Sequence, residues 1–200
     1  MRMRIAPGLQ LLGLLCLLNP LLSAQASSKD LLLQFAPAQT SVDFVLGATL
    51  HSVHGRFQLK RGSIQFNPAA NAISGELVVD AASGDSGNDR RDRRMHSEIL
   101  ESARFPEITF AAESAEGTLV SAGASNLKVH GKLTIHGAGH EVVVPVRVEL
   151  LPDHWSVSAH FSLPYVDWGM KNPSTFLLRV ERSVEIDVQA TGTKRGEPAK

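Results

Sequence analysis

The fold is decided by residues 129–148, VHGKLTIHGAGHEVVVPVRV, in which apolar and polar side chains alternate with period two. Successive residues of a strand point to opposite faces of a sheet, so each half of this stretch presents one apolar face. The glycine-rich residues 137–140 separate the two halves. The pattern therefore predicts an antiparallel hairpin whose register is fixed by its apolar face. The residues on that face are Val129, Gly131, Leu133, Ile135, Val142, Val144, Val146 and Val148.

The same alternation extends from Val42 to about Ala190, with Gly, Asn and Pro residues between the segments. Counting the segments gives eight or nine strands, most of them joined by short connections. No regular exchange of strand and helix supports a doubly wound sheet. We therefore predict an all-β fold, an eight-stranded antiparallel up-and-down barrel. The further strand segments are residues 42–46, 53–59 with a continuation at 64–66, 76–80, 108–110, 155–165, 176–180 and 184–188, and an apolar stretch at residues 31–35 precedes them.

One stretch, residues 89–102, is typical of an amphipathic helix. Met95 and Ile99 lie four residues apart, with Leu100 beside them, and arginines occupy the other side. Asn88 precedes the stretch and is a candidate N-cap. We expect this principal helix to cover one end or one side of the barrel.

The first 26 residues have the features of a secretory signal peptide. Arg2 and Arg4 precede an apolar run over residues 9–22, and Ala24-Gln25-Ala26 forms a small-x-small cleavage site. Gly13, Asn19 and Pro20 interrupt the run, which falls short of the roughly 18 uninterrupted apolar residues of a membrane span. We expect export to the periplasm, with secretion as the alternative, and no stable membrane insertion after cleavage.

Cleavage after Ala26 would leave 174 residues with 18 basic and 20 acidic side chains, a formal charge of −2. This length fits one domain, predicted over residues 27–192 and followed by a polar tail over 193–200. The charge balance predicts no binding of nucleic acid. The single cysteine, Cys16, lies in the leader, so the remaining chain has no thiol for a disulfide, a nucleophile or a metal site.

Residues 84–87, GDSG, match the nucleophile segment of trypsin-like proteases, where serine needs a histidine base and a buried aspartate. The flanking residues do not match, so we interpret the segment as a turn at the start of the helix and predict no catalytic residue. Seven histidines could supply nitrogen ligands to a metal. His130 and His136 share the polar face that carries Lys132, so we predict no metal site, although His51 has the parity of the inward residues.

Two features allow a functional and a structural interpretation. The arginines at positions 90, 91, 93 and 94 could contact phosphate or an anionic lipid head group, or form a solvated helix face with ion pairs to nearby acids. Tyr165, Trp168 and Met170 could form an adaptable lid over an apolar ligand, or simply the packed end of a strand.

Several stretches of the chain form an ordered set, namely residues 51–57 (HSVHGRF), 75–81, 88–110 with FPEITF at 105–110, 131–137 (GKLTIHG) and 167–170 (DWGM). In this order and spacing, over about residues 31–190, they together resemble the YceI family of periplasmic, lipocalin-like proteins. The resemblance implies a lipocalin-like barrel with helical cover whose lumen binds a polyisoprenoid or similar amphiphilic lipid, without a shared catalytic residue. Trp168 stands where the family commonly has phenylalanine.

These observations lead to a specific expectation for the lumen. A barrel with inward hydrocarbon side chains can enclose an apolar ligand, and water exclusion would drive binding. We expect the barrel wall, a cover from Met95 and Trp168, and a polar contact from Arg91 near the opening. The wall candidates are Phe57, Phe110, Leu133, Val144, Phe161 and Tyr165.

The expected partner is an amphiphilic lipid, with no other cofactor, and the sequence leaves a homodimer open. Two alternatives remain at this point. One is a periplasmic metal-binding or stress-protection protein whose barrel is filled by its own side chains. The other is a hydrolase that uses His51 or His96.

Overall fold

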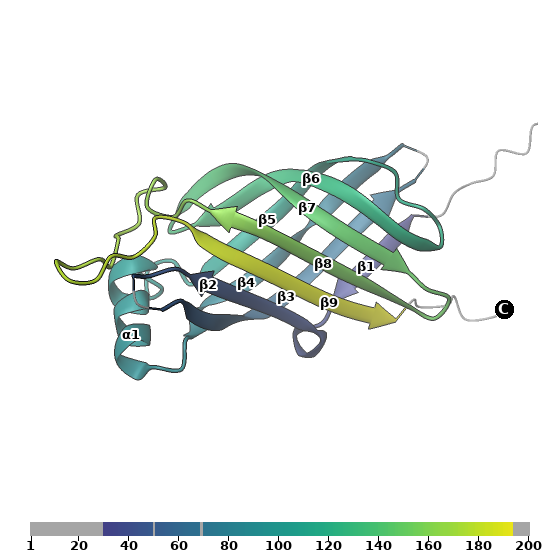
Figure 1. Cartoon of the computed structure of the whole chain (residues 1–200). Coiled ribbons are helices and arrows are strands. Elements are labelled where there is room, and N and C mark those ends of the chain that lie inside the picture. The colour runs from purple at the N-terminus through teal and green to yellow at the C-terminus, as the bar shows by residue number, and fades with distance from the viewer. Residues whose placement is uncertain (1–29, 50, 69, 194–200) are drawn as a thin grey trace, which may run out of the picture.

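The computed structural model describes residues 30–49, 51–68 and 70–193, and the predicted leader and residues 194–200 of the predicted tail lie outside this part. The described chain is an elongated barrel with a helical segment at one end (Figure 1). In this part of the chain, no helix is both long and apolar enough to cross a membrane. The strands are β1 (Leu31–Phe35), β2 (Thr40–Leu46), β3 (Val53–Asn67), β4 (Ala72–Asp85), β5 (Glu107–Glu116), β6 (Gly123–Ile135), β7 (Ala138–Leu150), β8 (His154–Leu163) and β9 (Val184–Thr193).

The barrel closes because its neighbouring strands pair all the way round, from β3 through β2, β9, β8, β7, β6, β5 and β4 back to β3. All of these pairings are antiparallel. Strand β1 pairs with the C-terminal half of β3, from Gly62 to Phe66, and is separated from β2 by a 3-10 turn, Pro37–Gln39. The predicted eight-stranded antiparallel barrel is confirmed.

Strand β3 shows how the inward pattern can change along one strand. Phe57 and Leu59 are buried at odd positions, whereas Ile64 and Phe66 are buried at even positions. The pairing of β3 with β4 shifts between Leu59 and Arg61, so a bulge changes which residues point inward. The sequence pattern predicts that a strand beginning at Val53 closes at Arg61-Gly62, but this is wrong, because β3 continues through these residues to Asn67.

The hairpin of β6 and β7 has a tighter turn than predicted. Ile135 pairs with Ala138, so the turn consists of His136 and Gly137 alone. Both residues have positive φ, +52° and +76°, as a type I′ turn requires. The turn predicted at residues 137–140 is wrong in position, since Ala138 already belongs to β7.

Gly137→Ala should lower the free energy of unfolding by more than Gly87→Ala does. Both glycines have φ near +75°, where an L-residue costs about 1–2 kcal/mol. A Cβ at Gly137 would also overlap the ring of Phe105, whereas a Cβ at Gly87 meets nothing within 4 Å. Urea denaturation of both variants measures the difference, and equal losses would contradict the packing described for this turn.

The helical segment is shorter than predicted. It comprises α1 (Asp89–Arg94) and a π-helical turn, η2 (Met95–Ile99), instead of one helix to Ser102. The Asn88 side chain accepts a hydrogen bond of 3.1 Å from the Arg91 backbone nitrogen, which confirms the predicted N-cap. Leu100 N donates to Met95 O, five residues back, and Glu101 has a positive φ of +47°, which ends the helical path.

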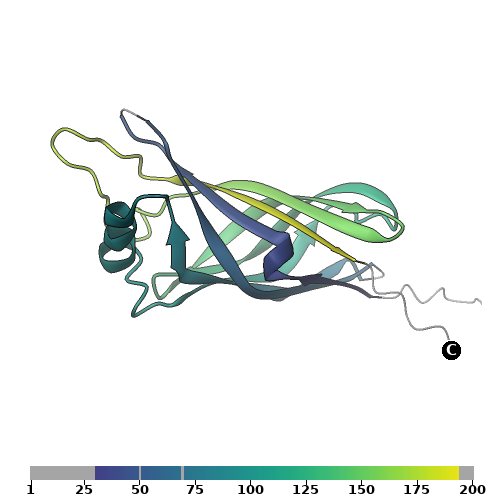
Figure 2. The same ribbon diagram turned by 90° about the horizontal axis from the view of Figure 1, so that it is seen from below.

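The connection from β8 to β9, residues 164–183, lies at the same end of the barrel as α1 (Figure 2). A strand was predicted at residues 176–180, but this prediction is wrong. The chain there forms only an isolated bridge between Val180 and Ala48. Phe176, which shares the parity of Leu178 and Val180 and was expected to face inward with them, is exposed, and so is Leu177.

Candidate functional site

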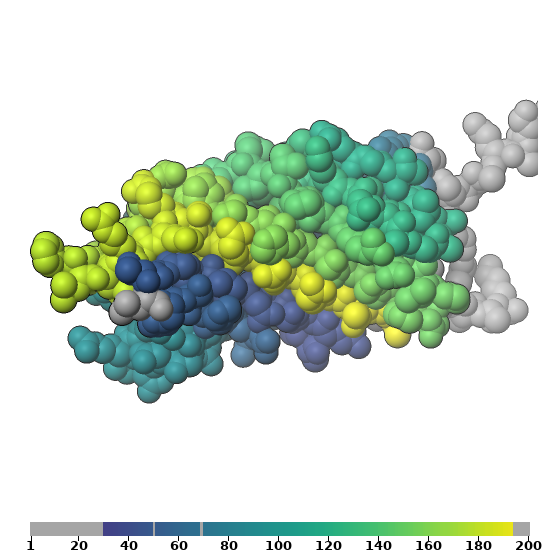
Figure 3. All heavy atoms as spheres, in the orientation of Figure 1, coloured from purple at the N-terminus to yellow at the C-terminus, as the bar shows by residue number. Residues whose placement is uncertain are grey.

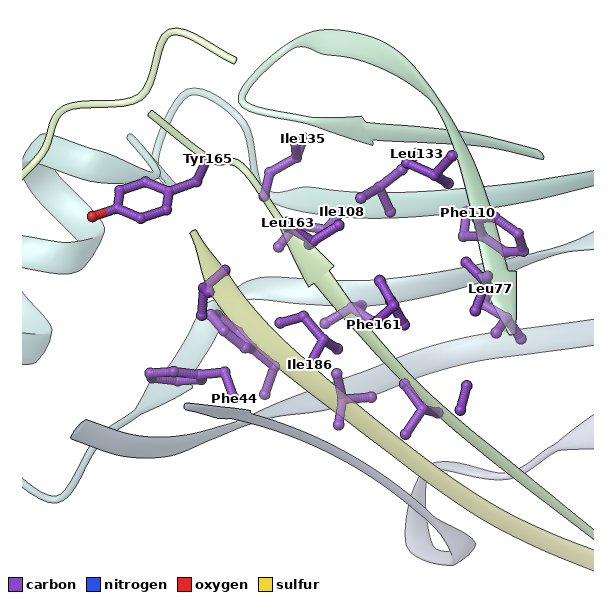
Figure 4. A pocket seen from close by; sticks show the side chains of 18 of the residues that line it. Phe44, Leu77, Ile108, Phe110, Leu133, Ile135, Phe161, Leu163, Tyr165 and Ile186 are labelled. Carbon is purple, nitrogen blue, oxygen red and sulfur yellow. The ribbon is translucent and has the colours of Figure 1, made fainter. Parts of the chain in front are cut away.

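The barrel encloses a cavity of about 620 Å³ (Figure 4). This volume lies within the range of about 300–1,000 Å³ that is usual for small-molecule sites. Every barrel strand contributes side chains to its wall, and nearly all of these are hydrocarbon. From β7 alone, Val142, Val144, Val146 and Val148 line the cavity, because residues two apart in a strand share one face.

Most residues of two buried apolar clusters line the cavity. At the far end from α1, Trp155 is almost fully buried and its ring centroid lies 5.0 Å from that of Phe35. At the α1 end, Phe44 and Phe57 pack at 5.4 Å, together with Leu100 and other buried residues. The interior is therefore not plugged by its own side chains, contrary to the alternative of a filled barrel.

Eight of the nine residues predicted from sequence to contact a ligand line this cavity. They come from β3, β5, β6, β7, β8, the helical segment and the loop that follows β8. They are Phe57, Arg91, Met95, Phe110, Leu133, Val144, Phe161 and Tyr165.

Trp168 is placed differently. Its ring stacks on His140, with centroids 4.1 Å apart and an angle of 6° between the planes. It packs against the cluster at the α1 end but is not among the residues that line the cavity. Met170, two residues further along the chain, is buried and does line the cavity.

Most polar side chains that line the cavity gather at the α1 end. Ser86 and Asn88 precede the helix, Arg90, Arg91 and Arg94 belong to it, and His51 lies before β3. Thr40, at the start of β2, is the exception, and its buried hydroxyl has no hydrogen-bond partner among the described residues. The cavity is thus apolar along the barrel and basic at one end, which we call the mouth.

Arg91 is tied to the turn before the helix. Its Nε and a terminal nitrogen donate to the Ser86 hydroxyl and carbonyl, each at 2.7 Å, and the same hydroxyl donates to Asp92. Burial alone would raise the pKa of Asp92, but hydrogen bonds from Ser86 and the charge of Arg91 outweigh burial and lower it. Only the second half of the GDSG segment is therefore the predicted turn: Gly84 and Asp85 end β4, and Ser86 and Gly87 connect it to the helix, held by an arginine and a carboxylate.

The helical segment is also joined to the loop at residues 164–183. Lys171 Nζ lies 2.6 Å from a carboxylate oxygen of Glu98, and this hydrogen bond lowers the pKa of Glu98. Arg94 donates to the carbonyl of Pro173 at 3.4 Å. Tyr165 OH donates to the Glu181 carbonyl at 2.8 Å, and burial raises the pKa of Tyr165 to about 12. The tyrosine therefore stays neutral at physiological pH and holds the base of the loop.

Part of the mouth was not predicted from the sequence. Arg90 and Arg94 were recognised only as members of an arginine cluster, while Leu178 and Val180 were assigned to a strand although they line the cavity from a loop. Among the described residues, no group of three or more His, Cys, Asp or Glu could hold a metal ion. His130 and His136 instead contact Glu116 and Glu101, at 2.9 and 3.1 Å.

Solved structures share this architecture. BcnA from Burkholderia cenocepacia matches with a TM-score of 0.65 and 21% identity, over 80% of this chain and 99% of that one. A polyisoprenoid-binding domain from Saccharophagus degradans matches with a TM-score of 0.61 and 19% identity, over 80% and 96%. A YceI protein from Campylobacter jejuni matches with a TM-score of 0.61 and 16% identity, over 74% and 88%. At these identities the likeness shows the fold.

Sequence comparison gives the family. A UPF0312 protein from Vibrio cholerae is 30% identical over 122 residues, which are 60% of this chain and 62% of that protein. The chain thus spans about three fifths of the curated relatives that it matches. The family model for the YceI-like domain matches residues 33–192, the whole barrel apart from its first and last residues. The chain therefore belongs to the YceI family.

Proposed function

We propose that this protein binds the hydrocarbon tail of a polyisoprenoid or similar amphiphilic lipid inside the barrel, and carries or sequesters that lipid in the periplasm. The observation that carries the proposal is the cavity of about 620 Å³, with its hydrocarbon wall and basic mouth. Removing apolar surface from water contributes roughly 25 cal/mol per Å², so a tail could bind without a polar anchor along its length.

Two further observations support the proposal. The polyisoprenoid-binding domain from Saccharophagus degradans has the same fold. The leader predicted at residues 1–26 supports export. The position of the polar side chains gives the bound lipid a direction, with its tail in the barrel and its head group at the mouth.

A tail held by water exclusion should bind more tightly as it lengthens. For alkyl phosphates of increasing length, we expect affinity to rise about fourfold for each buried methylene, or about 0.8 kcal/mol, until the cavity is full. Calorimetric titration of delipidated protein, below the concentration at which each ligand forms micelles, measures this slope. Affinity that does not depend on length would contradict binding in the lumen.

The arginines of the mouth can recognise a phosphate head group, since a guanidinium fork matches phosphate oxygens. Arg91 and Arg94 already bond to neighbouring groups of the protein, whereas Arg90 is exposed and lines the mouth. Arg90 is thus the guanidinium with the most freedom to contact a ligand.

Arg90→Glu should weaken binding of an alkyl phosphate about tenfold or more, because hydrogen bonds to charged groups contribute about 1.5–3 kcal/mol. Binding of the alcohol with the same chain should change little. Arg93→Glu is the matched control, since Arg93 is exposed on the same helix but does not line the cavity. Equal losses for the two variants would show that only the overall charge matters and would contradict a head-group contact at Arg90.

A further inference from the structure

The loop between β8 and β9 carries an exposed apolar tip. Phe176 is fully exposed and Leu177 is 85% exposed, more than any other large apolar side chain of the described residues. The loop projects beyond the barrel at the α1 end, where Figure 3 shows it in yellow-green. Exposing two neighbouring large apolar side chains at the end of a loop is unfavourable in water, and such patches mark interaction sites.

Hydrogen bonds hold this tip in place. Thr175 N donates to the Leu178 carbonyl at 2.8 Å, and Leu178 N donates to the Thr175 hydroxyl at 3.1 Å. These bonds close a turn whose two central residues are Phe176 and Leu177. Beyond the turn, Thr49 N donates to the Arg179 carbonyl at 2.9 Å, and Arg179 N donates to the Thr49 hydroxyl at 3.1 Å. The apolar tip is therefore an ordered turn fastened to the connection between β2 and β3.

The tip is continuous with the mouth of the cavity. Pro173 precedes it and Leu178 and Val180 follow it, and all three line the cavity. An apolar path thus leads from the exposed tip along the loop into the barrel. A hydrocarbon chain moving between another apolar phase and the lumen could stay in contact with apolar side chains along this path.

The mouth end is also more basic than the rest of the molecule. Residues 89–99 and 164–183 carry seven Lys or Arg and five Asp or Glu, whereas the rest of the described chain carries seven and fourteen. Within the described residues, Arg90 and Arg179 are exposed and take part in no ion pair. A basic end with free guanidinium groups is complementary to an anionic surface.

We propose that the mouth end docks on an anionic lipid bilayer. Phe176 and Leu177 enter the boundary between head groups and acyl chains, and Arg90 and Arg179 lie near lipid phosphates. An apolar insertion and basic side chains are two signals that together give stable but reversible membrane binding. This inference rests on the proposed function, because a docked membrane is where the protein would take up or release the lipid of its lumen.

The test uses the purified chain and vesicles of phosphatidylcholine with one quarter phosphatidylglycerol. Wild-type protein should cosediment with these vesicles and bind much less to pure phosphatidylcholine. Phe176→Ser/Leu177→Ser should weaken binding about tenfold or more, while Leu32→Ser, at an exposed apolar residue of β1, should leave it unchanged. Arg179→Glu should weaken binding about fivefold, while Arg147→Glu, at an exposed residue on β7, should not.

Full binding by Phe176→Ser/Leu177→Ser would overturn the proposal. The proposal would also be overturned if the wild-type protein were a dimer that does not bind vesicles and if this variant were a monomer, since the tip would then bind a second copy of the chain.

Val144→Asp, inside the barrel, distinguishes the docking proposal from the proposed function. If Val144→Asp loses lumen lipid but still binds vesicles, both the proposed function and the docking proposal are supported. If the tip variant loses lumen lipid while keeping vesicle binding, docking fails. If neither the wild-type protein nor the tip variant holds lumen lipid, the proposed function fails.

Discussion

Val144→Asp should abolish binding of long-chain lipid in the barrel. Val144 is buried in β7 and lines the cavity, so a carboxylate there would be surrounded by a wall of hydrocarbon side chains and would face the lumen. A buried group of this kind costs several kcal/mol in its charged form, or binds a proton instead. Either form removes apolar wall and adds a polar group, and we expect affinity for alkyl phosphates to fall by about a hundredfold or more.

The neighbouring residue provides the control. Val143 is also a valine of β7, but it is half exposed and points away from the lumen. Val143→Asp adds the same charge to the same strand, so it should bind lipid as wild type does. Circular dichroism and urea denaturation of both variants show whether each is folded. Normal lipid binding by a folded Val144→Asp variant would contradict the assignment of this wall.

Trp155→Ala should cause a large loss of stability. Trp155 is 1% exposed, packs against Phe35, and has its ring over Gly192 of β9, where a Cβ would overlap it. Removing a buried tryptophan typically costs about 3–5 kcal/mol, through lost burial and the cavity left behind. The loss should be measured by urea denaturation of delipidated protein, because a bound ligand stabilises the folded state.

Leu32→Ala is the control at the same end of the barrel. Leu32 is 60% exposed, so its truncation should change the free energy of unfolding by less than about 0.5 kcal/mol. A loss below about 1 kcal/mol for Trp155→Ala would mean that the far end of the barrel is not the packed cluster described above.

The sequence was sufficient to predict the barrel and most of its wall. Period-two alternation places Leu133 of β6 and Val144 of β7 inward, because each strand keeps one face toward the lumen. Local patterns carry this information wherever a strand is regular. They also identified the N-cap Asn88, whose hydrogen bond reaches only three residues along the chain.

Features that depend on distant contacts could not be predicted. The bulge near Arg61 follows from the register of β3 against β4, and it reverses the inward parity of Ile64 and Phe66. An apolar run at residues 176–180 resembles a strand, yet its pairing is with Thr49 and Ala48 and leaves Phe176 in solvent. Trp168 is near the expected cover, but stacking on His140 determines where its ring lies.

The lumen is the central claim, and mass spectrometry of organic extracts tests it most directly. Protein should be purified gently from its native compartment, without detergent, alongside Val144→Asp and Val143→Asp. We predict a lipid with a long hydrocarbon tail in extracts of wild type and Val143→Asp, in near-stoichiometric amount, and its loss from Val144→Asp. Extracts of folded wild-type protein that contain no such lipid, or equal amounts from all three proteins, would contradict the account.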